Sequence, residues 1–515
     1  MPPDKNGDYA YLLHILRCLK SRGKGACILP HGVLFRGNAE ADIRRSLVQR
    51  HLIKGIIGLP PNLFYGTGIP ACIIVLDKAG TAEREGIFMV DASRGFIKDG
   101  NKNRLLEMDI HRIVDVFNRQ TKVDGYSRLV LWAEIEKNEF NLNLPRYIDG
   151  SEPEDIQDLT GHLLGGIPER DIVALQPYWN VLPGLQAALF KPTGRPSYLQ
   201  LTVPVAEIKT TIFQHPEFVA YGERMQKVFR SWRQQTETYL GLLKASCQPK
   251  EVIAYISEEL LAIYAGQPLL DRYDVYQHLM TYWGTTMQDD CYLIAADGWQ
   301  APTYRILETN KKGQQVDKGW TCDLVPKGLV LARYFTKDQD LLQMVEAAVE
   351  ALQGELEALE EEHGGEEGIF AQFDSVTKGN VTPRYKELKA LKGKISPEEK
   401  DELAVLNQYL TLTADLADKK KLVKSTAAAL DARLLAFYPT LTTDQIQRLV
   451  IEDKWLGTLE REINTELDRL SQRLTQRVRE LAERYELPLP ALTTEVERLE
   501  ALVQGHLEKM LGTVG

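Results

Sequence analysis

The segment from residue 56 to residue 70 holds the greatest concentration of residues that could do chemistry. Phe64, Gly66 and Gly68 spell F-x-G-x-G, a pattern associated with loops that bind S-adenosylmethionine. Such a loop should leave a strand and enter a helix, whose N-terminal amides face the ligand. Here the glycines lead into another apolar run, so the sequence predicts a hairpin or a bulge instead.

Two aromatic residues in this segment have two interpretations. Phe64 and Tyr65 follow an apolar run, where a loop can present side chains to a site. Aromatic rings in that place can stack on a base that has been turned out of a nucleic-acid duplex. A capped core at the end of a sheet is the more common arrangement, and the two residues alone leave both interpretations open.

A second candidate segment, residues 29–37, follows the preceding apolar run and contains His31. His31 could be a general base, but no Ser, Cys or carboxylate is matched to it. A lone histidine in a loop is more often a hydrogen-bonding residue. Four basic residues near Gly95 and Gly100 could contact phosphates, although a solvated loop is the more common outcome; they are Arg94, Lys98, Lys102 and Arg104.

Composition limits the classes of protein that the chain can belong to. Its 515 residues, 44% hydrophobic and 26% charged, allow about three domains of ordinary size. The 62 Lys and Arg against 72 Asp and Glu give a net charge of −10. A nucleic-acid partner would therefore need a local basic patch or a second subunit. The six cysteines form no C-x-x-C pair, so no metal site is predicted and we expect a reduced, cytoplasmic protein. We also expect no membrane segment.

The apolar pattern alternates between helix and strand in the first hundred residues. It predicts helices over 9–20 and 39–50, and strands over 26–30, 53–59, 71–76 and 86–90. This alternation is typical of an α/β fold with a mostly parallel sheet and helices on its faces. Because the pattern begins with a helix, it predicts the second half of a doubly wound domain, whose ligand lies at the carboxyl ends of its strands.

The remainder of the chain is expected to be mainly helical. We predict a half α/β domain over 1–95, a connecting extension over 96–155, an irregular helical domain over 156–335 and long coiled-coil-like helices over 336–515. Apolar stripes over 341–359 and 459–481 predict long helices that pair with each other or with another chain. Residues 364–365 and the polar stretch near residues 379–380 are the predicted hinges or loops between them.

Several stretches, read together, resemble the modification subunit of type I restriction-modification systems. They are GDYAYL (7–12), ILPHGVLFRG (28–37), AEADIR (39–44), residues 59–70, DASR (91–94) and NLNLPRY (141–147). The resemblance covers nearly the whole chain. It implies a class I methyltransferase-like fold that transfers a methyl group from S-adenosylmethionine to N6 of a flipped adenine in DNA, within an assembly that holds a specificity subunit and often a nuclease subunit.

The resemblance also assigns roles to particular residues. Phe64 and Tyr65 would help line the base pocket, with Pro30 and His31 near the same cleft. The phosphate candidates remain Arg94, Lys98, Lys102 and Arg104, and the candidates for docking a specificity subunit are Leu467, Leu470 and Leu474.

The chain departs from the family in its catalytic motifs. Family members carry a glycine-rich cofactor loop and an Asn/Asp-Pro-Pro-Tyr/Phe motif, which accepts hydrogen bonds from the target amine. Met1-Pro2-Pro3 and Leu59-Pro60-Pro61 lack that acceptor. We therefore expect the carboxy-terminal portion of a modification subunit, inactive by itself and completed by an amino-terminal fragment. The alternatives are a non-catalytic module that docks a specificity subunit and clamps DNA, and a decayed remnant.

Overall fold

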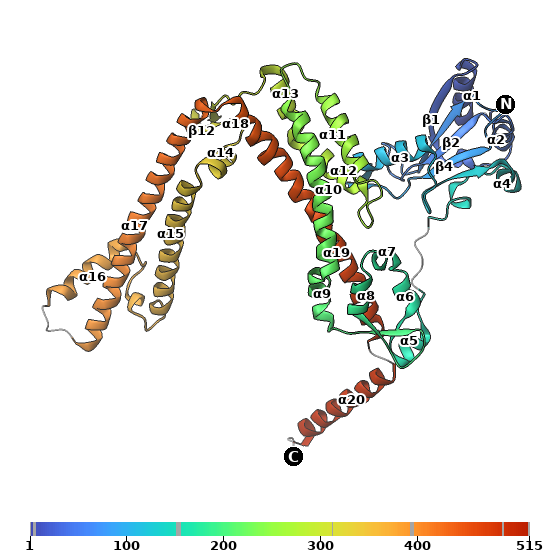
Figure 1. Cartoon of the computed structure of the whole chain (residues 1–515). Helices are drawn as coiled ribbons and strands as arrows, with labels where there is room; N and C mark the ends of the chain where they lie inside the picture. Colours follow the sequence, from blue (N-terminus) through green and yellow to red (C-terminus); the bar gives the residue numbers. More distant parts are fainter. Residues whose placement is uncertain are drawn as a thin grey trace. The chain divides into compact units, whose positions relative to one another are not determined.

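The computed structural model describes residues 2–3, 7–150, 156–311, 313–391, 396–486 and 489–512 (Figure 1). The chain forms two compact units. Unit 1 comprises Met1–Gln235, Ile253–Thr285 and Leu459–Gly515, and unit 2 comprises Thr236–Val252 and Thr286–Thr458.

A five-stranded sheet in unit 1 has the order β1-β3-β2-β4-β7. Its strands are β1 (Lys24–Pro30), β2 (Ile53–Gly58), β3 (Ala71–Asp77), β4 (Gly86–Asp91) and β7 (Ser127–Leu131). The four predicted strands are confirmed, but the expectation of a mostly parallel sheet is wrong. Only β2 and β4 pair in parallel, whereas β3 is antiparallel to β1 and β2, and β7 is antiparallel to β4.

The physical reason for the antiparallel pairing is the connection from β2 to β3. Residues 59–70 contain no helix, and a parallel crossover ordinarily needs one. The sheet also extends further along the chain than expected. Because β7 pairs with β4, the division predicted after residue 95 falls inside the sheet.

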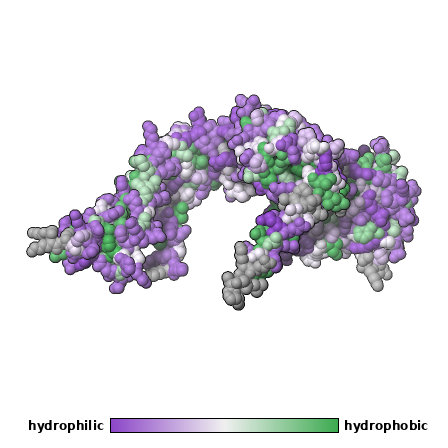
Figure 2. Space-filling model, turned by 90° about the horizontal axis from the view of Figure 1, so that it is seen from below, coloured by the Kyte–Doolittle hydropathy of each residue, from purple (hydrophilic) through white to green (hydrophobic). Residues whose placement is uncertain are grey.

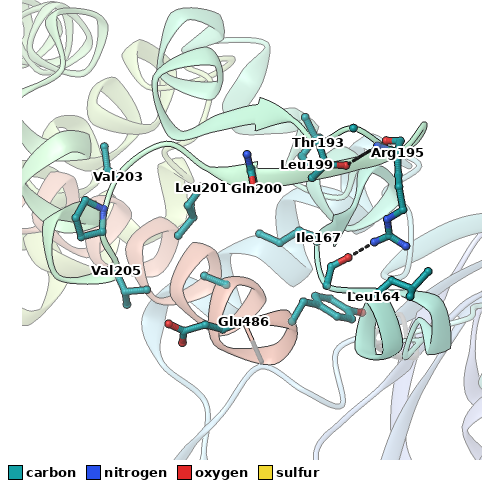
Figure 3. Close-up of a pocket in the computed structure, with 16 residues that line it drawn as sticks. Leu164, Ile167, Thr193, Arg195, Leu199, Gln200, Leu201, Val203, Val205 and Glu486 are labelled. Carbon is teal, nitrogen blue, oxygen red and sulfur yellow. Dashed lines mark hydrogen bonds between the residues drawn. The ribbon is translucent and has the colours of Figure 1, made fainter. Parts of the chain in front are cut away.

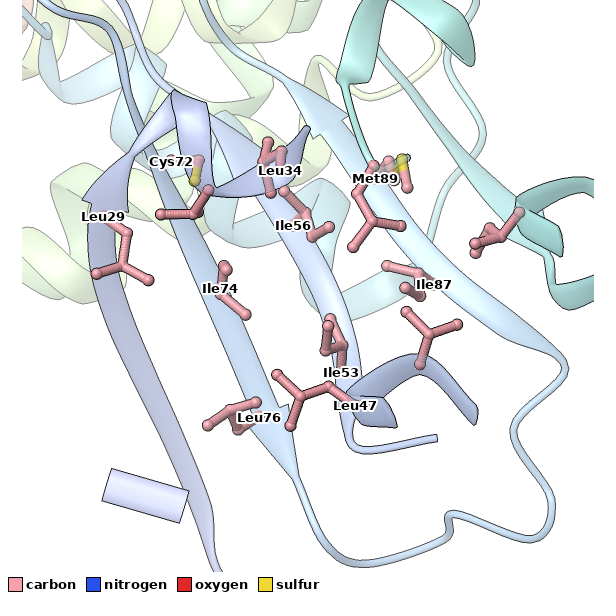
Figure 4. Packing of buried hydrophobic residues seen from close by; sticks show 14 of the residues in the cluster. Leu29, Leu34, Leu47, Ile53, Ile56, Cys72, Ile74, Leu76, Ile87 and Met89 are labelled. Carbon is pink, nitrogen blue, oxygen red and sulfur yellow. The ribbon is translucent and has the colours of Figure 1, made fainter. Parts of the chain in front are cut away.

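Helices cover both faces of this sheet, as the alternating pattern predicted. On one face, α1 (Asp8–Cys18) and α2 (Ala39–Gln49) pack on a core that includes Ile56 and Ile74 (Figure 4). On the other face, Ile57 and Phe88 pack with residues of α3 (Glu107–Arg119). Strands β2 and β4 are buried on both sides, which explains their continuous apolar runs.

Short elements follow the large sheet and lead to the longer helices. In the first half of the chain they are β5 (Ile97–Asp99), β6 (Lys102–Arg104), α4 (Trp132–Lys137), α5 (Leu159–Leu164), β8 (Ile167–Pro168), α6 (Glu169–Val173), α7 (Gln176–Trp179), α8 (Pro183–Leu189), β9 (Phe190–Pro192), β10 (Tyr198–Leu201) and α9 (Ile208–Gln214). The long helices are α10 (Pro216–Gly241), α11 (Pro249–Ile263), α12 (Arg272–Tyr282), α19 (Gly457–Tyr485) and α20 (Leu489–Gly512).

Unit 2 contains a long antiparallel helix pair. Helix α15 (Thr336–His363) and helix α17 (Pro397–Phe437) share a core with α16 (Lys378–Ala390). The remaining elements are α13 (Gln288–Asp297), the ribbon of β11 (Tyr304–Thr309) and β12 (Gln315–Thr321), α14 (Lys327–Tyr334) and α18 (Thr443–Gln447). The ribbon was not predicted.

The structure also tests the long-helix predictions. The helix predicted over 341–359 is confirmed, and it ends at His363, just before the loop predicted at 364–365. The loop predicted near residues 379–380 lies just before them, because the Thr377 side chain caps α16 and the helix begins at Lys378. The helix predicted over 459–481 is confirmed as α19, but α15 pairs with α17 instead.

Hydrophilic residues dominate the face in Figure 2, where apolar residues form scattered groups. Within the described ranges, no helix combines the length and apolarity needed to cross a bilayer.

The β4–β7 pairing yields a test of the sheet order. A Cβ at Gly86 would overlap the carbonyl oxygen of Val130, whereas one at Gly37 would meet open space. We predict that Gly86→Ala destabilises the sheet by about 1–3 kcal/mol and speeds amide exchange in residues 86–91 and 127–131. Hydrogen-exchange mass spectrometry measures this, with Gly37→Ala as the control. Equal exchange in the two variants would contradict the pairing.

Candidate functional site

Three strands of the sheet end at the same edge. Strands β1 and β2 are both antiparallel to β3, and β4 is parallel to β2, so β1, β2 and β4 run in one direction. Their ends bring together His31, Leu59 and Asp91, which we call the carboxyl edge. Backbone hydrogen bonds fix it: His31 N donates to Pro70 O at 3.0 Å, and Ala92 N donates to Gly58 O at 3.0 Å.

His31 and Asp91 approach each other over Gly58. An ideal Cβ on Gly58 would lie 3.8 Å from His31 Nε2 and 3.7 Å from Asp91 Oδ1. His31 Nε2 is buried and has no hydrogen-bond partner in the described part of the chain. Burial lowers the pKa of His31, and the negative charge of Asp91 opposes that shift. The edge therefore presents a neutral imidazole with an unpaired ring nitrogen, a group that calls for a ligand or water.

A buried arginine holds the turn that carries His31. Arg44, on α2, is 3% exposed. Its guanidinium donates to Val33 O at 3.1 Å, Arg36 O at 3.0 Å and Phe140 O at 2.8 Å. Tyr9 on α1 also donates to Val33 O, at 2.8 Å. Sequence reasoning missed Arg44, although an arginine among the core-facing positions of a predicted helix was a usable signal.

The loop after β2 separates its two aromatic residues. Phe64 is half-buried and packs against the Ile57 and Phe88 cluster under α3. Tyr65 is 94% exposed. Phe64 thus lies where the core interpretation placed it, and Tyr65 is the ring that the loop presents to the outside.

The basic candidates have different environments. Lys102 Nζ donates to Phe64 O at 2.8 Å and Thr67 O at 3.1 Å, so it braces the loop. Arg104 pairs with Asp99 at 3.3 Å. Lys98 lies 6.0 Å from the centre of the Phe96 ring, and the Arg94 guanidinium lies beside Gly150.

The glycines of the F-x-G-x-G pattern do not fit S-adenosylmethionine. Gly66 has φ +79°, and the chain then enters β3, which is antiparallel to β2. No helix N-terminus follows the glycines, so the predicted hairpin-like turn is confirmed. In the described ranges, no group of three or more His, Cys, Asp or Glu is placed to hold a metal ion.

A cavity of about 660 Å³ lies in another part of unit 1 (Figure 3). Its walls are about equally polar and apolar, and the apolar residues include Leu164, Ile167 and Leu201. Arg195, on its wall, donates to the carbonyl of Gly165 and lies 4.1 Å from the centre of the Tyr198 ring. Thr193, Tyr485 and Glu486 also line the cavity, and we assign no chemistry to it.

The proposed docking leucines of α19 are mostly internal. Leu470 and Leu474 are only 2% and 1% exposed, and Leu467 is partly buried. The expectation that this stripe faces a partner is therefore wrong for Leu470 and Leu474, because their side chains already pack within unit 1.

A sheet with helices on both faces defines a domain of the α/β class. Residues 1–156 match the model of the N-6 DNA Methylase family. Type I methylase subunits of other organisms confirm the resemblance over the amino-terminal third of the chain.

Individual relatives give the same result. The type I restriction enzyme MjaVII methylase subunit of Methanocaldococcus jannaschii is 37% identical over 166 residues, 32% of this chain and 28% of that protein. The MpnII methylase subunit of Mycoplasma pneumoniae is 30% identical over 159 residues, 31% and 29% of the two chains. The chain thus spans less than a third of either relative's length.

One solved structure is also similar in sequence. The type I restriction-modification methyltransferase subunit from Streptococcus thermophilus is 40% identical, with a TM-score of 0.28, over 29% of this chain and 31% of that one. Because these matches cover about a third of the chain, resemblance of the helical remainder stays a prediction.

The environment of His31 predicts a pH effect. Its folded-state pKa lies below the ordinary value, so the unfolded chain binds the proton more readily and stability falls as pH drops through about 6.5. We predict that His31→Gln removes part of this loss between pH 7.5 and 5.5 in urea titrations.

In NMR titrations, Asp91→Asn should lower the His31 pKa further. A His31 pKa above 6.5 would contradict the burial.

Proposed function

We propose that residues 1–150 are the carboxy-terminal part of an adenine-N6 DNA methyltransferase domain, in the modification subunit of a type I restriction-modification system. The observation that carries this proposal is the carboxyl edge, where His31 and Asp91 converge beside the loop that presents Tyr65. This edge lies within the family-matched segment. We assign it to one wall of the pocket for a flipped adenine.

The residues of the edge suit the recognition of a base. A neutral imidazole can donate or accept a hydrogen bond with the polar edge of adenine. The exposed Tyr65 ring can stack on the base. Phe64, anchored in the core, and Lys102, bonded to the loop carbonyls, fix the path of the loop that carries Tyr65.

The proposed reaction needs groups that the described residues do not supply. S-adenosylmethionine, when bound, supplies the methyl group, but the described residues do not fit it and we derive no transfer step from them. The printed sequence contains no Asn/Asp-Pro-Pro-Tyr/Phe motif to orient the amine. The 515-residue chain is therefore inactive by itself and acts with a polypeptide segment that contributes those groups.

Strand β1 is where such a segment can join the sheet. Among the described strands it pairs only with β3, and Ile28 is 54% exposed. A free sheet edge of this kind accepts a further strand through main-chain hydrogen bonds.

Reconstitution tests the proposed activity. We predict no N6-methyladenine from the purified chain with S-adenosylmethionine and DNA. Methylation should appear when a segment with the cofactor loop and an Asn-Pro-Pro-Phe motif is added together with a specificity subunit. Tyr65→Ala should then lower kcat/KM about tenfold or more through lost stacking, measured by mass spectrometry of digested DNA.

The matched control for this substitution is Tyr292→Ala, another exposed tyrosine at 56%. Methylation by the 515-residue chain alone would refute the inactivity. An equal loss in both tyrosine variants would refute the role of Tyr65.

A second candidate function, assembly without catalysis, is favoured by α20. Its apolar side chains are exposed, from 42% at Leu492 to 58% at Val503. Val496, Leu499 and Val503 follow coiled-coil spacing, with Glu495 and Glu500 on the flanks. A parallel second copy would place Glu500 against Glu495, which Arg498 already pairs at 2.6 Å, so that contact would gain no attraction. A helix of a specificity subunit with an apolar seam and basic flanks fits better.

A pair of substitutions tests this docking surface. We predict that Leu499→Glu with Val503→Glu abolishes co-purification with the specificity subunit, because two carboxylates then occupy the apolar seam. Leu422→Glu, at a leucine of α17 that is 44% exposed, should leave it intact. Co-purification of the α20 double variant with the specificity subunit would contradict the assignment.

A further inference from the structure

We propose that unit 2 carries a second DNA-contacting surface, the lysine stripe, which consists of Lys420, Lys421 and Lys424 on α17 and binds the phosphate backbone of duplex DNA. The inference rests on DNA as the substrate of the proposed function. It adds a contact in a part of the chain that lies outside the family-matched segment.

The three lysines are exposed and uncompensated. They lie within five successive residues of a 41-residue helix, with their side chains in solvent. No ion pair among the described residues includes any of them. Leu412, Leu416 and Leu430 of the same helix are buried, so the apolar contacts fix α17 while the lysines stay free to bind.

A carboxylate of α17, Asp431, lies in line with Lys420 and Lys424 but is already paired. Lys420, Lys424 and Asp431 stand at i, i+4 and i+11, which lie on one side of a helix. Asp431 is already paired, since Lys327 Nζ lies 2.7 Å from Oδ1 and Trp320 Nε1 donates to Oδ2 at 2.9 Å. The one carboxylate at these three positions is thus neutralised within the chain.

The same contacts fix the β11–β12 ribbon beside Asp431, about 16 Å along the helix from Lys420. Trp320 belongs to β12 and is 3% exposed, and Lys327 lies 3.9 Å from the centre of its ring. Opposite Trp320 in the ribbon stands Arg305. From Lys420 to Lys424 the helix rises about 6 Å, which matches about two phosphates of one strand.

Acidic residues near the stripe limit the proposed DNA contact to a short stretch of α17. The whole chain has a net charge of −10, and between Lys337 and Lys378 it contains no Lys or Arg. Helix α15, which pairs with α17, is therefore acidic over most of its length. A DNA contact must be local, and screening over about 8 Å at physiological salt weakens repulsion from more distant acidic groups.

Binding of a fluorescent 25-base-pair duplex to the full chain, followed by anisotropy between 50 and 200 mM salt, tests the stripe. The variant is Lys420→Gln, Lys421→Gln and Lys424→Gln together. The control is Lys378→Gln, Lys386→Gln and Lys400→Gln, three exposed lysines of the same unit, so both variants lose three positive charges. We expect the stripe variant to lose about tenfold in affinity at low salt and the slope of log K against log salt to fall by about 2.7.

The inference is overturned if the unaltered chain does not bind the duplex, if the stripe variant keeps the same affinity and salt slope, or if the control variant loses as much affinity. It is also overturned if the stripe variant binds DNA as before but is no longer retained on immobilised poly-glutamate. The last result would assign the stripe to an acidic protein surface. The binding assay contains no S-adenosylmethionine and measures no methylation. Its result can therefore be told apart from a failure of the proposed methyltransferase activity.

Discussion

The direction of β3 is the constraint on which the candidate site depends. Because β3 runs antiparallel between β1 and β2, those two strands point the same way, and the parallel β2–β4 pair adds a third strand end. His31, Leu59 and Asp91 meet only for this reason. With a helical crossover in place of residues 59–70, the Tyr65 loop would start and finish at opposite edges of the sheet.

Much of this arrangement could be predicted from sequence, but not the pairing. The apolar runs at 53–58, 71–77 and 86–91 are strong signals because their strands are buried. Strand direction has no such signal in a run such as Ala71–Asp77, since side-chain alternation is the same in both directions. The position of His31 was predictable from its place after a strand, whereas its unpaired Nε2 depends on the long-range approach of Gly58 and Asp91.

The helical part shows where periodicity is insufficient. Leu470 and Leu474 follow the same spacing as an exposed docking stripe, yet they are buried. The exposed apolar stripe is on α20, and nothing in the spacing alone separates the two helices. Burial is a property of the neighbours that each helix meets, and those neighbours come from distant segments.

The two proposed surfaces recognise different parts of DNA: the carboxyl edge binds a base, and the lysine stripe binds phosphates. The carboxyl edge offers few charges, a neutral imidazole and an aromatic ring, which suits one base removed from the duplex. The lysine stripe offers charge without a pocket, which suits phosphates in any sequence. An acidic chain can engage DNA in this way, because attraction is confined to short, exposed segments.

Photo-cross-linking tests the central claim most directly. Benzoylphenylalanine replaces Tyr65, and in a second protein it replaces Leu131, which is 50% exposed and lies at the opposite edge of the sheet. In the reconstituted complex with its recognition duplex, the account predicts cross-links from position 65 to the target adenine nucleotide and none from position 131. Two results would contradict the assignment of the carboxyl edge to the base pocket. One is a DNA cross-link from position 131 with none from position 65, and the other is a position 65 that cross-links to protein and never to DNA.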